Sequence, residues 1–253
     1  FRQAGDDDML AVLSAVDAEP SPARQAMLWG IAFLQRDELT LARQHLERAV
    51  ALAPGQGCAV PYGLWFEVGN NVVRGLSIVG FDQASAPISG GLILHVGSGS
   101  TIEDNYIGLL PGGTPWGNRN GILLGSESHT IESNVISGNT YGVHAFMGGH
   151  IIDQNFIGTN PGGTSTSLDL RNTIGVYIEP GADSNEIGLS GTGNLISGNG
   201  DGVYLGSQGN TLLGNKIGTD HTGTIALGNG TGVHAYVGTH NVVGGTVPGD
   251  TNL

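Results

Sequence analysis

The stretch Asn105-Tyr106-Ile107-Gly108 recurs along the chain as Asn, a variable residue, Ile, and then Gly or Ser. The further copies begin at Asn134, Asn155, Asn194 and Asn215, and the fourth position alternates strictly between Gly and Ser. A phrase that returns after about 20 to 50 residues is typical of solenoids and other repeat architectures. The sequence therefore predicts a stack of similar structural units.

A second phrase sets the shape of each unit. It consists of Gly, an apolar residue, a variable residue and another apolar or small residue, and its seven copies begin at Gly63, Gly91, Gly121, Gly142, Gly175, Gly202 and Gly232. Each copy is too short for a helix and has the alternation of a strand. We expect a mainly β protein, with a right-handed parallel β-helix of about seven coils over residues 58–253. The first and third residues after each Gly should face inward.

The five asparagines of the first phrase are predicted to form a ladder at one corner of the coils: Asn105, Asn134, Asn155, Asn194 and Asn215. Stacked side-chain amides can hydrogen-bond along such a ladder, which is a structural role. The Ser copies are followed by a short coil of 21 residues, whereas the Gly copies introduce longer loops. Those three loops should project from the same corner.

These phrases resemble a family of bacterial right-handed parallel β-helix repeat proteins, which carry N-x-I-S-G-N, I-G-T-D-x-x-G-T-x-A-L-G-N and G-V-x-I segments. The stretch from Ile217 to Asn229 matches the longest motif closely, and Asn71 to Phe81 looks like the usual first full coil. The resemblance covers residues 63–253. It implies an extracellular or cell-surface setting, but little about activity, because one fold hosts many functions.

Residues 1–57 are helical in character and contain five of the eight arginines. The stretch from Ala23 to Ala53 has apolar residues at helical spacing. It resembles a single tetratricopeptide repeat through Gly30, Phe33, Ala42, Leu46, Ala49 and Pro54. One such repeat cannot bury its apolar face alone, so two interpretations remain. The segment is either the last repeat of a peptide-binding array or a helical cap on the following domain.

Composition excludes several kinds of partner. The formal net charge is −13 and Lys216 is the only lysine, so the basic footprint of a nucleic-acid-binding protein is missing. Cys58 is the only cysteine, so no internal disulfide can form. No run of about 18 apolar residues occurs, and we expect no membrane span.

The variable residue of each Gly phrase should point outward and stack in a column: Trp65, Ile93, Leu123, His144, Tyr177, Tyr204 and His234. A second outward column, two residues further on, reads Glu67, His95, Gly125, Phe146, Glu179, Gly206 and Tyr236. Six steps of about 4.8 Å give this aromatic, apolar and histidine-rich face a length of roughly 29 Å. Three interpretations remain open: stacking that stabilises the coils, docking of a protein or a second copy, and stacking of sugars.

A third outward column follows the ladder asparagines and is also mostly apolar: Tyr106, Val135, Phe156, Leu195 and Lys216. Two apolar outer faces favour lateral packing against other chains.

Signals for an enzyme are weaker. His144 and Tyr177 lie in neighbouring coils of one column and could form the acid–base pair of a polysaccharide lyase or uronate epimerase. Such enzymes must also neutralise a carboxylate, and none of the four cations of the β-helix region falls in that column: Arg74, Arg119, Arg171 and Lys216. Glu103, Asp104 and Asp220 are interpreted as isolated, solvated acids, and the histidines lack metal-ligand spacing. We therefore expect neither a metal ion nor another cofactor.

The sequence thus predicts an extracellular or cell-surface structural and binding protein that acts as a self-assembly or adhesion scaffold. Its expected binding face comprises Trp65, His144, Phe146, Tyr177, Glu179, Tyr204, His234 and Tyr236. The expected partners are further copies of the chain, in an oligomer or filament, or a polysaccharide. The alternatives are a lyase or epimerase that uses His144 and Tyr177, and a piece of a tetratricopeptide scaffold.

Overall fold

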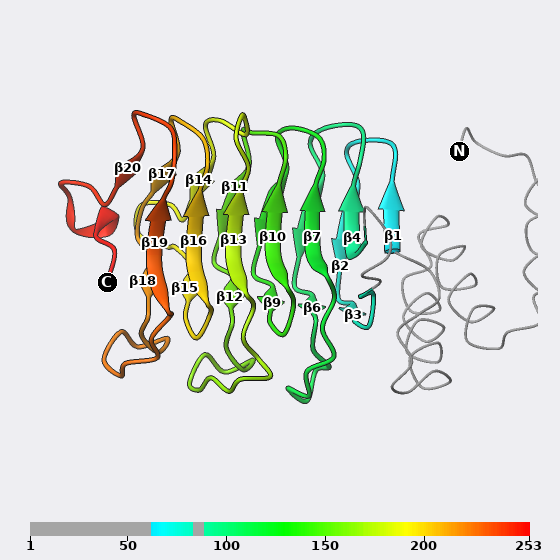
Figure 1. Ribbon diagram of the computed structural model, residues 1–253, viewed down its shortest axis with the longest axis horizontal. Helices are drawn as coiled ribbons and strands as arrows, with labels where there is room; N and C mark the ends of the chain where they lie inside the picture. The colour runs from blue at the N-terminus through cyan, green and yellow to red at the C-terminus, as the bar shows by residue number, and fades with distance from the viewer. Residues whose placement is uncertain (1–61, 83–88) are drawn as a thin grey trace, which may run out of the picture. The chain divides into compact units, whose positions relative to one another are not determined.

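The computed structural model of the protein describes residues 62–82 and 89–253. Within them the chain forms three sheets, and every strand pairs parallel to its neighbours (Figure 1). The helical segment expected over residues 1–57 lies outside the described residues. This mainly β architecture is consistent with a parallel β-helix.

The strands are short and recur in a fixed order. The first sheet contains β1 (Tyr62–Phe66), β4 (Gly90–Leu94), β7 (Asn120–Leu124), β10 (Tyr141–Ala145), β13 (Ile174–Ile178), β16 (Asp201–Leu205) and β19 (Thr231–Ala235). The second contains β2 (Val72–Arg74), β5 (Thr101–Glu103), β8 (Thr130–Glu132), β11 (Ile151–Asp153), β14 (Glu186–Ile187), β17 (Thr211–Leu212) and β20 (Val242–Val243). The third contains β3 (Ser77–Ile78), β6 (Tyr106–Ile107), β9 (Val135–Ile136), β12 (Phe156–Ile157), β15 (Leu195–Ile196) and β18 (Lys216–Ile217). A short 3-10 turn, η1 (Pro248–Asp250), follows β20.

The core consists of aliphatic columns in which the same position of successive coils carries a buried side chain. The first sheet contributes Leu92, Ile122, Val143, Val176 and Val203, the second Ile102, Ile131, Ile152, Ile187 and Leu212, and the third Ile107, Ile136, Ile157 and Ile196, all without exposed surface. Strands in neighbouring coils lie about 4.8 Å apart, so these side chains pack directly on one another. At the two ends of the described stack the expected inward positions are less shielded, because Phe66 is half-buried and Ala235 is exposed.

Hydrogen bonds along the stack join the five asparagines of the first phrase. Each Oδ1, from Asn134 to Asn215, accepts both the backbone N–H and the Nδ2–H of the asparagine one coil earlier, at 2.9–3.0 Å. Asn252 extends the ladder by one rung. A second ladder at another corner joins Asn118, Asn139, Asn172, Asn199 and Asn229. Fully satisfied buried amides fix the register of the coils, since an unpaired one is costly.

A third corner uses two histidines in place of asparagines. The Nδ1 atoms of His129 and His150 accept the backbone N–H groups of Ser100 and His129, at 3.2 and 3.1 Å. The same ladder continues through asparagine side chains at Asn185, Asn210 and Asn241. The two imidazole rings are stacked, with centroids 5.4 Å apart and planes 9° from parallel.

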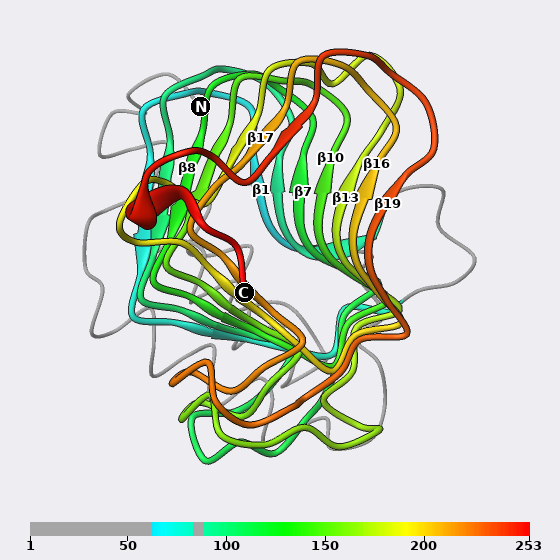
Figure 2. The ribbon, with the colours of Figure 1, turned by 90° about the vertical axis from the view of Figure 1, so that its left-hand side faces the viewer.

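The three long loops after Gly108, Gly158 and Gly218 project together from one corner, at the bottom of Figure 2. The His221 N–H donates to the Gly163 carbonyl at 2.8 Å, so loops two coils apart touch. A Cβ on Gly163 would lie 2.8 Å from Leu195 and 3.0 Å from Phe156, which places this loop directly over both side chains. The expectation of a free apolar face at this column is therefore wrong at Leu195, which is 3% exposed.

Two acids expected to be solvated have partners instead. The Asp220 carboxylate is buried and accepts the Thr222 hydroxyl and the N–H groups of Thr224 and Ile225. Glu103 forms an ion pair with Arg74 at 3.5 Å. The interpretation of Asp220 as an isolated acid is wrong, because this carboxylate closes its own loop.

Candidate functional site

The first outward column forms in the predicted register on the first sheet. Each of its residues pairs with the next, from Trp65 through Ile93, Leu123, His144, Tyr177 and Tyr204 to His234. The backbone ladder continues past the strands, because the N–H groups of Glu179, Gly206 and Tyr236 donate to carbonyls of the preceding coil. The second outward column is therefore also in register.

The face is not exposed along its whole length. Ile93 has no exposed surface and Leu123 is 4% exposed, so the expectation that both lie on an open face is wrong. Strand alternation assigns a side chain to one side of a sheet, but it does not determine whether that side is covered. The open part lies in the later coils, where Phe146 and Tyr236 are 44% and 66% exposed and Tyr177 and Tyr204 are half-buried.

A further column, missed from the sequence, lies beside the first. It contains the residue that precedes each repeated Gly, and its members Asn120, Tyr141 and Asp201 occupy equivalent register positions. The Tyr141 ring contacts the rings of His144 and Tyr177, at 4.8 and 5.6 Å between centroids. Tyr141 therefore lies on the outer face with them. The polar or aromatic character of the residues just before several of these glycines could have indicated this column.

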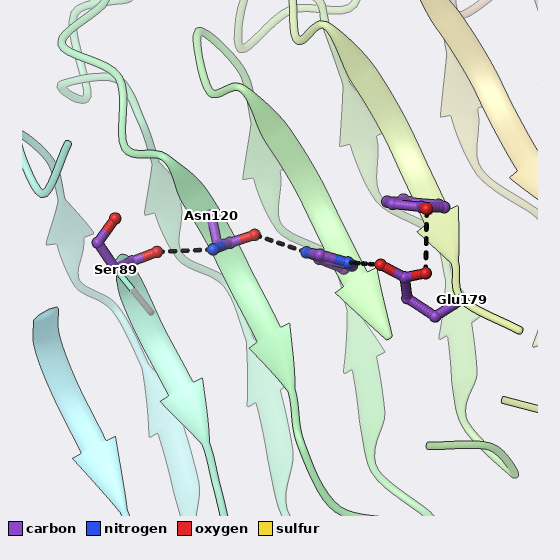
Figure 3. Close-up of polar contacts among 5 residues, drawn as sticks. Ser89, Asn120 and Glu179 are labelled. Carbon is purple, nitrogen blue, oxygen red and sulfur yellow. Dashed lines mark hydrogen bonds and ion pairs between the residues drawn. The ribbon is translucent and has the colours of Figure 1, made fainter. Parts of the chain in front are cut away.

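A polar network runs across four coils of this face (Figure 3). The Asn120 Nδ2–H donates to the Ser89 carbonyl at 2.6 Å, which turns Oδ1 of Asn120 toward Nδ1 of His144 at 2.8 Å. Nε2 of His144 lies 3.0 Å from Oε1 of Glu179. The Tyr177 hydroxyl donates to the other carboxylate oxygen, also at 3.0 Å. Glu179 therefore links the histidine and the tyrosine.

Burial and the Glu179 carboxylate set the protonation of His144 and Tyr177 in this network. Burial lowers the pKa of His144, the Glu179 hydrogen bond and charge oppose that shift, and the positive charge of Arg119 adds to it. Desolvation and then Glu179 raise the pKa of Tyr177 to about 12, so its hydroxyl stays protonated at neutral pH. Both ring nitrogens of His144 face oxygen atoms, an arrangement that favours the doubly protonated ring, whereas burial favours the neutral ring. In either form Asn120 and Glu179 hold the ring in place.

Aromatic contacts extend the site toward the later coils. His144 and Tyr177 are stacked, with centroids 4.7 Å apart and planes 13° from parallel. Tyr177 and Tyr204 meet edge to face at 5.1 Å, and Tyr204 contacts His234 at 4.7 Å. Tyr236 lies 6.0 Å from Tyr204. Edge-to-face and offset pairs of this kind stabilise one another by about 0.5–1.5 kcal/mol.

A smaller aromatic group lies at the first coils. The Trp65 ring contacts Tyr62 and His95, each with centroids 4.7 Å apart, and its Nε1–H donates to Glu67 at 3.2 Å. The buried aliphatic side chains of Ile93 and Leu123 occupy the column between the two aromatic groups. The structure thus divides the predicted binding face into two parts.

A positively charged side chain, which the column of His144 and Tyr177 lacks, lies near it on a neighbouring coil. Arg119 directly precedes Asn120, the first residue of β7, and its charge acts on His144. Within residues 62–82 and 89–253, no group of three or more His, Cys, Asp or Glu side chains is placed to hold a metal ion. The same residues include no helix of the length and hydropathy needed to cross a bilayer.

Comparison of the chain with models of known protein families and with curated protein sequences finds no match. The site's own geometry must therefore carry any functional argument.

Proposed function

We propose that the protein is an extracellular or cell-surface scaffold, a right-handed parallel β-helix of the bacterial repeat type, whose later coils present an aromatic face that docks a partner. The observation that carries the proposal is the continuous set of ring contacts from Tyr141 to Tyr236, which remains half-open to solvent. Contiguous exposed apolar surface on a soluble protein is a mark of an interaction site. The right-handed sense follows from the preference of parallel crossovers for that hand.

Adhesion to a different molecule is favoured over self-assembly through this face. A symmetric contact between two copies brings the same patch of each together, so Glu179 and Asp201 would oppose acids of the second copy. Each copy also carries a formal net charge of −13. Like charges at a desolvated interface weaken association, whereas a complementary partner avoids the repulsion.

The test uses the double variant Tyr177→Asp with Tyr204→Asp. Retention on insoluble polysaccharide and light scattering at high concentration measure adhesion and self-assembly. If the face docks a partner, the double variant loses whichever association the wild-type protein shows, while an exposed-loop variant such as Leu168→Asp keeps it. Equal behaviour of the wild type and the double variant in both assays, and in binding of charged peptides, refutes a docking role for this face.

A polysaccharide lyase or uronate epimerase is the second candidate. It is favoured by the connected His144, Glu179 and Tyr177 groups and by the proximity of Arg119, a group that could neutralise a uronate carboxylate. It is opposed by the burial of His144, which is 6% exposed. A lyase raises ultraviolet absorbance from unsaturated ends when incubated with uronate polymers, and His144→Ala removes that signal. A flat absorbance with the wild-type protein rules out the lyase.

A further inference from the structure

In the second outward column Gly206 carries no side chain, and Pro180 of the preceding coil packs beside it, since a Cβ at Gly206 would lie 3.1 Å from the Pro180 Cδ. Gly206 occupies the position between Glu179 and Tyr236, and its N–H donates to the Ile178 carbonyl in the regular ladder. Two coil steps of about 4.8 Å separate the backbones of Glu179 and Tyr236 by about 10 Å. Gly206 itself is buried, so the open surface at this level is formed by the half-buried Tyr204 ring and the exposed Tyr236 ring, with the Glu179 carboxylate on the other side.

The rings around this position are set at different angles. Tyr204 is nearly perpendicular to Tyr177, at 85°, and is tilted by 32° from Tyr236. Perpendicular rings present both faces and edges to a shared volume. A cation gains electrostatic attraction when it lies over the face of such a ring, within about 6 Å of its centre.

The carboxylates at this position have no lysine or arginine partner in the described part of the chain. Asp201 makes no ion pair and no side-chain hydrogen bond there, and Glu179 is held by His144 and Tyr177 alone. Their negative charges both act on Tyr204. Arg119, whose charge acts on His144, directly precedes β7, three coils before the strand of Tyr204. The patch is thus both aromatic and uncompensated in charge.

We propose that this patch, formed by Glu179, Asp201, Tyr204 and Tyr236 around Gly206, binds guanidinium groups of an arginine-rich segment of a partner protein. The inference rests on the proposed docking function and specifies its partner. A guanidinium group is planar and weakly hydrated, so it stacks on tyrosine and pairs with carboxylates at once, which an ammonium group does less well. The overall charge of −13 also attracts a basic segment over long range.

The test measures binding of fluorescein-labelled hexa-arginine to the full chain by anisotropy at about 0.1 M salt, where the Debye length is about 10 Å. Asp201→Asn and Tyr204→Leu should each weaken binding by about two- to five-fold, the range for exposed cation–π contacts. Tyr204→Phe keeps the ring and should bind like wild type. Glu186→Gln removes one exposed charge from the second sheet and should also bind like wild type. Circular dichroism establishes that each variant is folded.

Three results overturn the inference. Equal weakening by Glu186→Gln and Asp201→Asn shows that only the overall field attracts the peptide. Unchanged binding by Tyr204→Leu shows that the peptide does not contact this ring. Equal affinity for hexa-lysine shows that the patch has no preference for guanidinium groups. The proposed docking function survives these results if Tyr204→Leu instead abolishes self-association or binding of neutral cellohexaose. Both proposals are refuted if neither Tyr204→Leu nor the double variant Tyr177→Asp with Tyr204→Asp changes the binding of any of these ligands or the self-association.

Discussion

The histidine ladder predicts that the protein loses stability in mild acid. Nδ1 of His129 and of His150 each accepts a backbone N–H, so the ring must be neutral, with its proton on Nε2. Protonation would place an N–H donor at Nδ1 against another donor. Burial lowers the pKa of His129 from 6.5 to about 4, and burial together with the charge of His129 does the same for His150.

The direction of the pH dependence follows from the difference in proton binding between the unfolded and folded states. Between about pH 6.5 and 4 the two histidines bind protons in the unfolded chain but stay neutral in the folded protein. The free energy of unfolding therefore rises with pH across this range. The contribution is fully present above pH 6.5 and is lost as the pH falls toward 4. A shift of this size at His150 corresponds to a loss of about 2 kcal/mol between pH 8 and pH 5. His129 is also buried, but fewer protein atoms surround it than surround His150, so we assign it a smaller share of about 1 kcal/mol.

The perturbation is the double variant His129→Asn with His150→Asn. Asparagine already fills the next rungs of this ladder at Asn185 and Asn210, and its Oδ1 accepts the same backbone bond without titrating. The variant should therefore keep the coil register and lose the histidine contribution to the pH dependence. Urea unfolding by circular dichroism, at pH 8 and pH 5, measures the difference.

We expect the free energy of unfolding of the wild-type protein to fall by about 3 kcal/mol more than that of the double variant over this range. The exposed-loop variant His221→Asn should follow the wild type. Because stacked repeats can unfold in parts, hydrogen exchange at the Ser100 and His129 amides supplies a local readout. Parallel pH profiles for wild type and double variant, or an NMR titration of either histidine near pH 6.5, refute the reasoning.

Three further substitutions test the interior of the stack. Asn155→Ala leaves the buried backbone N–H of Asn134 without its acceptor and removes the hydrogen bond from the Asn155 side chain to the Ile131 carbonyl. It should destabilise the protein by about 2–4 kcal/mol in urea unfolding; a loss below 1 kcal/mol would contradict a buried ladder. Gly163→Val combines a φ of +62° with a Cβ 2.8 Å from Leu195, so its loop should lift and increase the fluorescence of an apolar dye; unchanged dye fluorescence would show that the loop does not shield Leu195. Asp153→Ala removes the acceptor of N–H groups from the loop over residues 189–193, which should be cut faster by a protease, whereas wild-type cleavage rates would contradict this.

The parts of the fold that repeat could be predicted from the sequence. The asparagine at the first corner and the variable residue of each Gly phrase recur with fixed neighbours, and stacking turns such recurrence into columns. The pairing of His144 with Tyr177 followed directly from counting coils. Repetition also places the three long loops at one corner, because each follows the same Asn-x-Ile-Gly phrase.

The contents of the outer face were less predictable. Period-two alternation made the residue before each Gly look inward, yet Tyr141 contacts His144 on the outer face. In the register between β10 and β13, Tyr141 and Val143 pair with residues of the next coil, and Gly142 between them does not. Asn120, in the same column as Tyr141, holds Nδ1 of His144, so sequence reasoning named His144, Tyr177 and Glu179 for this face but missed Asn120. Burial of Ile93 was likewise hidden, since it depends on which segments cover the face and not on the strand's own pattern.

The histidine ladder shows how such a feature could have been found. Identical residues reveal a ladder only where every coil carries the same side chain, whereas the corner requires only an acceptor atom at the right distance along the side chain. Nδ1 of histidine and Oδ1 of asparagine are both bonded to Cγ, so either atom can accept the backbone N–H of the preceding coil. Residues 100, 129 and 150 each lie five positions before a ladder asparagine, at 105, 134 and 155. The same offset joins Asn210 to Asn215, whereas Asn185 lies nine positions before Asn194. A fixed offset from a known ladder is therefore a useful signal of a second one, and here it leads to a corner whose stability depends on titratable side chains.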